Sequence, residues 1–181
     1  FDGGIMLFKG GQPEAALAKF TAALKDLPGD PVLHEVKALA LFALGRFRES
    51  AAVLNALLAV APGMDWTSMS NLYGDVEQYT QQLRALEEHI RKNPSDASAM
   101  FVLAYHYLVI GQNDAAVKML KEVVRLKPDD VTAKRMLETL DPPEDDPAAT
   151  VAEEKPAEDG PTTDLVGNWT SDDKTPIKLT I

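Results

Sequence analysis

The stretch GQNDAAVKMLKEVVRLKPDD, residues 111–130, contains the pattern that decides the fold. Gly111 is followed by the small residue Ala116, and the large apolar Leu120 comes four positions later, on the same face of a helix. Pro128 closes the stretch, because proline lacks an N–H and cannot continue a helix. The stretch therefore predicts a glycine turn, then an amphipathic helix, then a proline stop.

The same pattern occurs twice earlier in the chain, as GQPEAALAKFTAALKDLPGDP from Gly11 and GRFRESAAVLNALLAVAPG from Gly45. These two copies are offset by 34 residues, and Pro94 and Pro128 are also 34 residues apart. A period of this length predicts a helix–turn–helix unit that stacks on its neighbours.

This pattern resembles the tetratricopeptide repeat, and the resemblance covers residues 1–140. It implies an all-α fold, a helix–turn–helix repeat solenoid that forms a superhelix. We expect four repeats and a capping helix, at residues 1–30, 31–62, 63–96 and 97–130, with the cap at 130–140.

The third copy departs from the pattern. Glu77 stands at the position of the turn glycine, and Gln82 and His89 stand at the positions of small residues. Helical spacing of apolar residues nevertheless continues through this region. We expect a repeat with a shortened first helix and a moved turn, with Asp75 able to cap the second helix.

Residues 141–163 have a different composition, with five prolines and no aromatic residue or leucine. Nine acids fall between Asp141 and Asp164, where Lys155 is the single base, so this segment carries most of the net charge of −10. Such a segment cannot bury enough apolar area to offset its ordering entropy. We therefore expect an acidic, proline-rich flexible linker.

Residues 164–181, DLVGNWTSDDKTPIKLTI, return to an apolar pattern. Ile177, Leu179 and Ile181 alternate with other residues as in a β-strand. The Gly-x-Trp motif before a polar turn resembles the first strands of a small lipocalin-like β-barrel. We expect this segment to be the truncated start of a β domain.

Several kinds of chemistry lack the residues they require. The chain has no cysteine, which excludes disulfides and thiolate sites. No phosphate-binding glycine loop or hydrolase motif occurs, and His34, His89 and His106 fall in different repeats at unrelated phases. We expect no enzyme activity, no cofactor and no metal site in the repeats.

Composition also limits the partners and the compartment. The absence of a basic stripe argues against nucleic-acid binding, and no apolar run reaches the roughly 18 residues of a membrane span. No N-terminal signal pattern is visible, which favours the cytoplasm. The chain begins inside a repeat, however, so a signal or anchor upstream of Phe1 stays an open alternative.

In the family that the chain resembles, the first helix of each repeat lines a concave groove. The Lys and Asn residues with which the family grips a C-terminal carboxylate are replaced here by apolar and aromatic residues and one acid. We expect an apolar groove for a partner peptide or helix; a neighbouring segment, a second copy or a preceding helix could also fill it. The resemblance places these residues in the groove: Phe1, Ile5, Phe8, Glu35, Leu39, Phe42, Phe101, Tyr105, Leu108 and Val109.

The segment around His106 shows how the repeat assigns individual roles. At about 100° per residue on a helix, Tyr105 and Tyr107 point about 200° apart. Tyr107 takes the aromatic signature position of the family, which implies that it lies in the core. Tyr105 falls on the groove face, and His106 is expected to be a packed, hydrogen-bonded histidine.

These observations predict a protein–protein interaction scaffold or adaptor whose partner is a protein or peptide. A second hypothesis is a repeat module that self-associates and displays the C-terminal β domain. A third hypothesis places small-molecule binding or enzyme activity in the missing part of the β domain.

Overall fold

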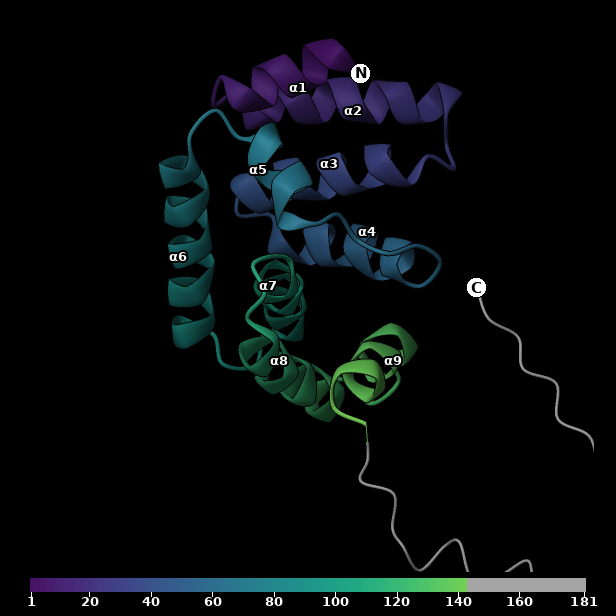
Figure 1. The fold of residues 1–181 in the computed structure, drawn as a ribbon, viewed down its shortest axis with the longest axis vertical. Coiled ribbons are helices and arrows are strands. Elements are labelled where there is room, and N and C mark those ends of the chain that lie inside the picture. Colours follow the sequence, from purple (N-terminus) through teal and green to yellow (C-terminus); the bar gives the residue numbers. More distant parts are fainter. Residues whose placement is uncertain (143–181) are drawn as a thin grey trace, which may run out of the picture. The chain divides into compact units, whose positions relative to one another are not determined.

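The computed structural model describes residues 1–142, which fold into nine helices (Figure 1). No strand occurs among these residues, and the prediction of an all-α fold is confirmed. Residues 143–163 of the expected linker and the expected β segment at 164–181 lie outside the described residues. The helices are α1 (Asp2–Lys9), α2 (Pro13–Asp26), α3 (Pro31–Ala43), α4 (Phe47–Leu58), α5 (Trp66–Leu72), α6 (Val76–Lys92), α7 (Ala97–Val109), α8 (Asn113–Leu126) and α9 (Val131–Leu140).

Aspartates begin five of these helices. Each side chain accepts a hydrogen bond from a backbone N–H in the first turn, at N···O distances between 2.7 and 3.0 Å. Such bonds satisfy donors that a helix leaves free at its start. The predicted cap at Asp75 is among them, bonded to the N–H of Glu77. The five caps are Asp30, Asp65, Asp75, Asp96 and Asp130.

The three turn glycines of the repeat share one conformation. Gly11, Gly45 and Gly111 have φ values of 69°, 70° and 76°, a region that residues with a Cβ rarely adopt. In each turn the N–H after the glycine donates to a carbonyl five residues back, which is the Schellman arrangement. These bonds run from Gln12 to Leu7, Arg46 to Leu41 and Gln112 to Tyr107, at 2.9, 2.9 and 2.8 Å.

The small residues of the repeat are buried where helices approach closely. Ala16, Ser50 and Ala116 each have 0% exposed surface. Ser50 also donates its hydroxyl to the carbonyl of Ala38, at 2.9 Å, and so bonds α4 directly to α3. A larger side chain at these positions would push the paired helices apart.

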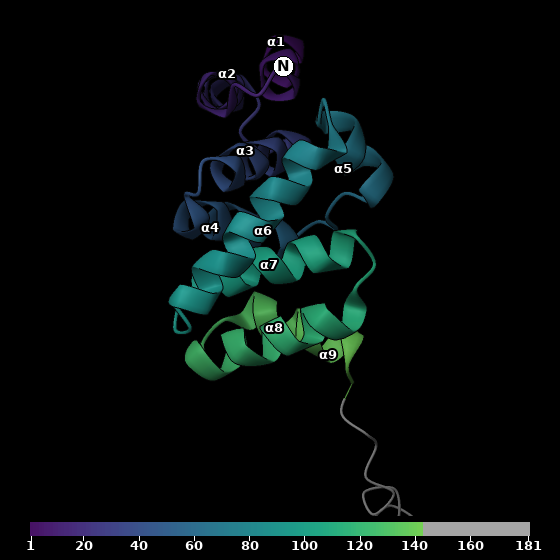
Figure 2. The ribbon, with the colours of Figure 1, turned by 90° about the vertical axis from the view of Figure 1, so that its left-hand side faces the viewer.

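The order of packing skips two helices. Helices α1, α2 and α3 each pack against the next helix in the chain. The next helix that packs against α4, however, is α7, and α8 and α9 follow in order. Figure 2 shows α6 in front of this stack, crossing α3, α4 and α7, and α5 at the side of the stack. The third copy is therefore outside the regular stack.

Local sequence explains this departure. Helix α5 has only seven residues and ends at Tyr73, whose backbone is extended (φ −92°, ψ 143°). The turn thus lies earlier than Glu77, so the predictions of a shortened helix and a moved turn are confirmed. Gln82, in place of a small residue, accepts a hydrogen bond from the Tyr73 hydroxyl at 3.0 Å.

Aromatic side chains hold α5 and α6 against the other helices. The ring centroid of Tyr73 lies 5.0 Å from that of Phe8 on α1. Tyr79 on α6 lies 6.5 Å from Phe42 on α3 and 5.6 Å from His106 on α7. Helices α5 and α6, with Tyr73 between them, therefore cover the C-terminal halves of α1, α3 and α7.

We predict that Gly45→Ala lowers the free energy of unfolding by about 1–2 kcal/mol, because its positive φ is unfavourable for any residue with a Cβ. An added Cβ meets no atom within 4 Å, so no clash contributes. Gly29→Ala is the matched control, since Gly29 also has open space but no positive φ. Urea unfolding measures both variants, and equal effects would contradict the conformational explanation.

Candidate interaction surfaces

The structure divides the ten predicted groove residues into covered and accessible ones. Phe1 is 55% exposed, and Ile5, Leu108 and Val109 are partly buried. The other six have at most 5% of their surface exposed, so a partner could reach them only after a rearrangement. These six are Phe8, Glu35, Leu39, Phe42, Phe101 and Tyr105.

Glu35 forms the centre of the covered region. Its Oε1 accepts hydrogen bonds from the hydroxyl of Tyr105 and from the backbone N–H of Met64, both at 2.7 Å. Since Glu35 lies on α3 and Tyr105 on α7, one bond joins the segment between α4 and α5 to α3, and the other joins α7 to the same carboxylate oxygen. The chain thus covers part of its own predicted groove.

The backbone at Gly63, in the segment between α4 and α5, lies close against Tyr105 and Glu35. A Cβ added at Gly63 would lie 3.0 Å from the Tyr105 ring and 3.2 Å from Glu35 Oε1. Burial, and then the charge of Glu35, raise the pKa of Tyr105 well above its usual value. The Tyr105 hydroxyl therefore keeps the proton that it donates to Glu35.

His106 lies in an aromatic cluster beside this contact. It has no exposed surface, and its ring centroid is 4.0 Å from that of Phe42. Its Nδ1 lies 3.3 Å from the Tyr79 hydroxyl, whereas Nε2 has no hydrogen-bond partner. Burial lowers the pKa of His106 to about 3. The prediction of a packed, hydrogen-bonded histidine is confirmed, and the ring is neutral at pH 7.

Tyr105 is buried where the repeat predicts an open groove face, and Tyr107 is partly buried against the core. Tyr105 is only 1% exposed, whereas Tyr107 is partly exposed and donates its hydroxyl to Glu87 Oε1 at 2.9 Å. Burial, followed by the bond to Glu87, raises the pKa of Tyr107 to about 12. The physical reason is the segment after α4, which covers the face of α7 that the repeat pattern left open to solvent.

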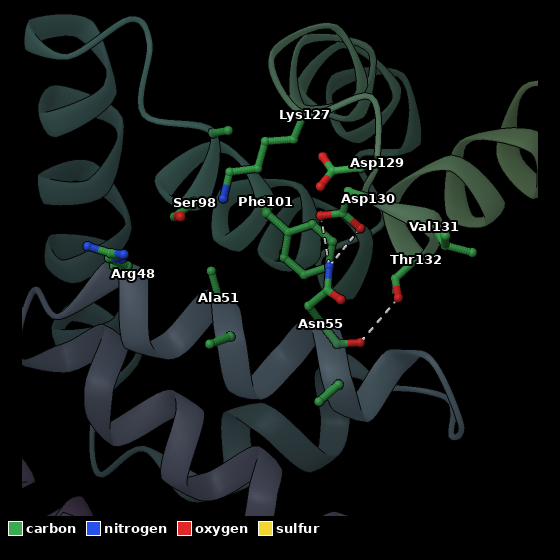
Figure 3. A pocket seen from close by; sticks show the side chains of 13 residues that line it. Arg48, Ala51, Asn55, Ser98, Phe101, Lys127, Asp129, Asp130, Val131 and Thr132 are labelled. Atoms are coloured by element: carbon green, nitrogen blue, oxygen red, sulfur yellow. Dashed lines mark hydrogen bonds between the residues drawn. The ribbon is translucent and has the colours of Figure 1, made fainter.

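A polar cleft of about 530 Å³ separates α4 from the start of α9 (Figure 3). Asn55 Nδ2 donates to both carboxylate oxygens of Asp130, at 2.8 and 2.9 Å, and Thr132 donates its hydroxyl to the Asn55 carbonyl at 3.4 Å. Phe101, expected in the groove, lines this cleft instead. These bonds fix the last helix to α4.

The cleft offers charges of both signs. Arg48 and Lys127 are exposed cations on its wall, and Asp129 is an exposed acid. Within residues 1–142, no group of three His, Asp or Glu side chains is placed to hold a metal ion. The same residues contain no helix that is long and apolar enough to cross a membrane.

An apolar hollow of about 480 Å³ opens at the other end of α4, and we call it the α9 hollow. A smaller hollow of about 230 Å³ shares Leu58, Leu108 and Met136 with it and extends to Val109. Leu108 and Val109 of the predicted groove therefore lie on an accessible apolar surface. The α9 hollow is lined by Leu58, Ala59, Val60, Ala61, Pro62, Leu108, Arg135, Met136, Thr139 and Leu140.

The sequence pattern did not single out most of these residues. Asn55 and Asp130 are 75 positions apart, and their contact depends on α7 and α9 packing against α4. Arg135 donates to the Ala59 carbonyl at 2.8 Å for the same reason. An aspartate before α9 does signal a cap, but no signal in the repeat pairs it with Asn55.

Comparison with family models supports the repeat assignment. Two family models, each described as tetratricopeptide repeat, match residues 7–74 and 77–154. Two solved structures are similar at 22% identity and a TM-score of 0.34. One is MamA 41-end from Desulfovibrio magneticus RS-1, covering 77% of this chain and 80% of that chain. The other is the MamA RS-1 ArsTM double mutant, covering 82% and 84%. A comparison with curated proteins finds no match.

We predict that Tyr105→Ala lowers the free energy of unfolding by about 3–5 kcal/mol, as truncation of a buried aromatic side chain does. Tyr107→Ala should cost less, at most about 2 kcal/mol, because Tyr107 is partly exposed. Chemical denaturation of both variants measures the difference. A larger loss for Tyr107→Ala would contradict the burial described above.

A second prediction concerns pH. The folded pKa of His106 is about 3, while the unfolded value is about 6.5. As the pH falls below 6.5 the unfolded chain binds a proton that the folded chain does not, so stability is lost between pH 6.5 and about 3. From pH 7 to 5.5 the native chain should lose about 1 kcal/mol more than His106→Leu. Urea unfolding at each pH measures both proteins. If the free energy of unfolding of the native chain and of His106→Leu falls equally with pH, this role for His106 is refuted.

Proposed function

The chain belongs to the tetratricopeptide repeat family, and we propose that it is a scaffold that receives an apolar segment of a partner protein in the α9 hollow. Tetratricopeptide repeats are in general non-enzymatic modules for protein interaction. That general property supports an interaction role here, and the proposal adds the surface at which the interaction occurs.

The accessible apolar area supports this choice of surface. Val60, at the rim of the α9 hollow, is 86% exposed, although apolar surface is more stable when it is removed from water. The hollow has a volume of about 480 Å³, within the roughly 300–1,000 Å³ that is usual for binding sites. Contiguous exposed apolar surface of this kind marks interaction sites.

The covered groove residues support the choice in another way. Glu35 accepts hydrogen bonds from Tyr105 and from the segment after α4. Phe8 and Phe42 pack against the rings of Tyr73 and Tyr79. A partner in the original groove would have to displace these contacts. A partner at Leu108 and Val109 would leave them in place, so the proposal narrows the predicted site to that end of α7.

We predict that Val60→Glu reduces capture of the partner by at least about tenfold, because a charge would be desolvated in the apolar contact. The full chain, immobilised as bait in an extract of its source cells, is compared with this variant by quantitative mass spectrometry. Val76→Glu is the matched control, since Val76 is also exposed, at 52%, but does not line the hollow.

Circular dichroism should show the same helix content in both variants and in the native chain. If Val60→Glu and Val76→Glu retain the same proteins in the same amounts, the α9 hollow is not the binding surface. If the protein lost from Val60→Glu is the chain itself, the interaction is self-association instead.

A further inference from the structure

We propose that the partner segment is an amphipathic helix with acidic flanks, which lies across two apolar hollows on either side of Val60. This inference rests on the function proposed above and specifies the chemistry of the partner. Three observations carry it: a second hollow next to the first, the mainly apolar lining of both, and the sign of the charged side chains that line them.

The second hollow lies between α3 and α4, has a volume of about 410 Å³, and is here called the α3 hollow. Val60 lines both hollows, and it is the most exposed of the large apolar residues in the described chain. It therefore projects between them, and no residue of α5 or α6 lines either one. The lining residues are Gly29, Pro31, His34, Lys37, Ala52, Val53, Ala56, Leu57 and Val60.

This arrangement suits a helix better than an extended peptide. An extended segment needs partners for its backbone N–H and C=O groups, and both hollows are lined mainly by alanine, valine, leucine, proline and methionine. A helix satisfies its own backbone groups and presents apolar side chains on one face. Two such side chains could enter the two hollows while Val60 packs between them.

The charges around the hollows have one sign. Lys37 lines the α3 hollow and Arg135 lines the α9 hollow, whereas no acid of the described chain lines either hollow. Lys37 and Arg135 form no ion pair with any residue in 1–142. The chain as a whole is acidic, with a net charge of −10, so this basic rim is a local exception to its charge.

Nearby acids in the described part of the chain do not form ion pairs with Lys37 or Arg135, the two cations that line the hollows. The bond to Arg46, and to a lesser extent the charge of Lys37, lower the pKa of Glu49, and the Glu49 carboxylate is held by Arg46 at 2.7 and 2.8 Å. The Arg135 guanidinium donates to the Ala59 carbonyl at 2.8 Å, which fixes it at the rim of the α9 hollow. Acidic side chains flanking an apolar helix face would complement both cations, and basic ones would be repelled.

The test uses two synthetic helical peptides of about 18 residues with the same leucine face, one flanked by glutamates and the other by lysines. Fluorescence anisotropy measures binding of each to the full chain at low and moderate salt. We expect the acidic peptide to bind roughly tenfold more tightly at low salt, with a smaller ratio at higher salt. The double variant Lys37→Glu/Arg135→Glu should reverse this preference, and Val60→Glu should weaken both peptides while Val76→Glu does not.

Contrary results separate this inference from the proposed function. Equal binding of both peptides, still lost in Val60→Glu, would overturn the acidic flanks and leave the α9 hollow as the binding surface. If the affinity of both peptides is unchanged in Val60→Glu and in the double variant, the two hollows are not the binding site. If sedimentation detects a dimer that Val60→Glu dissociates, the occupant is a second copy, and the acidic partner helix is rejected.

Discussion

The close approach of paired helices at Ala16, Ser50 and Ala116 is the constraint on which the structure depends. Each of these residues is fully buried, and each follows a glycine turn with positive φ. The third copy has Gln82 in place of the small residue and lacks the glycine. Its two helices lie outside the stack, and α7 packs on α4. The copy that departs from the pattern is thus also the one whose helices are not in the stack.

The placement of α5 and α6 outside the stack determines which apolar surfaces of the chain stay accessible. The helices α5 and α6 and the segment before them cover residues that the repeat pattern predicts to line a groove, among them Phe8, Phe42 and Tyr105. Glu35 is the polar centre of this cover, since one of its oxygens bonds both Tyr105 and Met64. A buried carboxylate is costly without such bonds, so the cover and the side chain beneath it stabilise each other. Accessible apolar surface remains at the end of α4, around Val60.

The sequence predicted local features well because local features depend on neighbours in the chain. The turn glycines, the cap at Asp75 and the short α5 follow from backbone conformation and helix capping within a few residues. The burial of Tyr105 is not predictable from the repeat pattern, because it depends on a segment about forty residues away that covers it. The contact of Asn55 with Asp130 was not predictable either, because it exists only if α9 reaches α4.

Amide hydrogen exchange at Met64 tests most directly whether the chain fills its own groove. Met64 lies between α4 and α5, outside any helix, and its N–H donates to the buried Glu35 side chain. If this contact persists in solution, the Met64 amide exchanges at least about tenfold more slowly in the native chain than in Glu35→Ala. Exchange in the native chain at the rate of an unstructured peptide would show that the groove is open and would contradict the account.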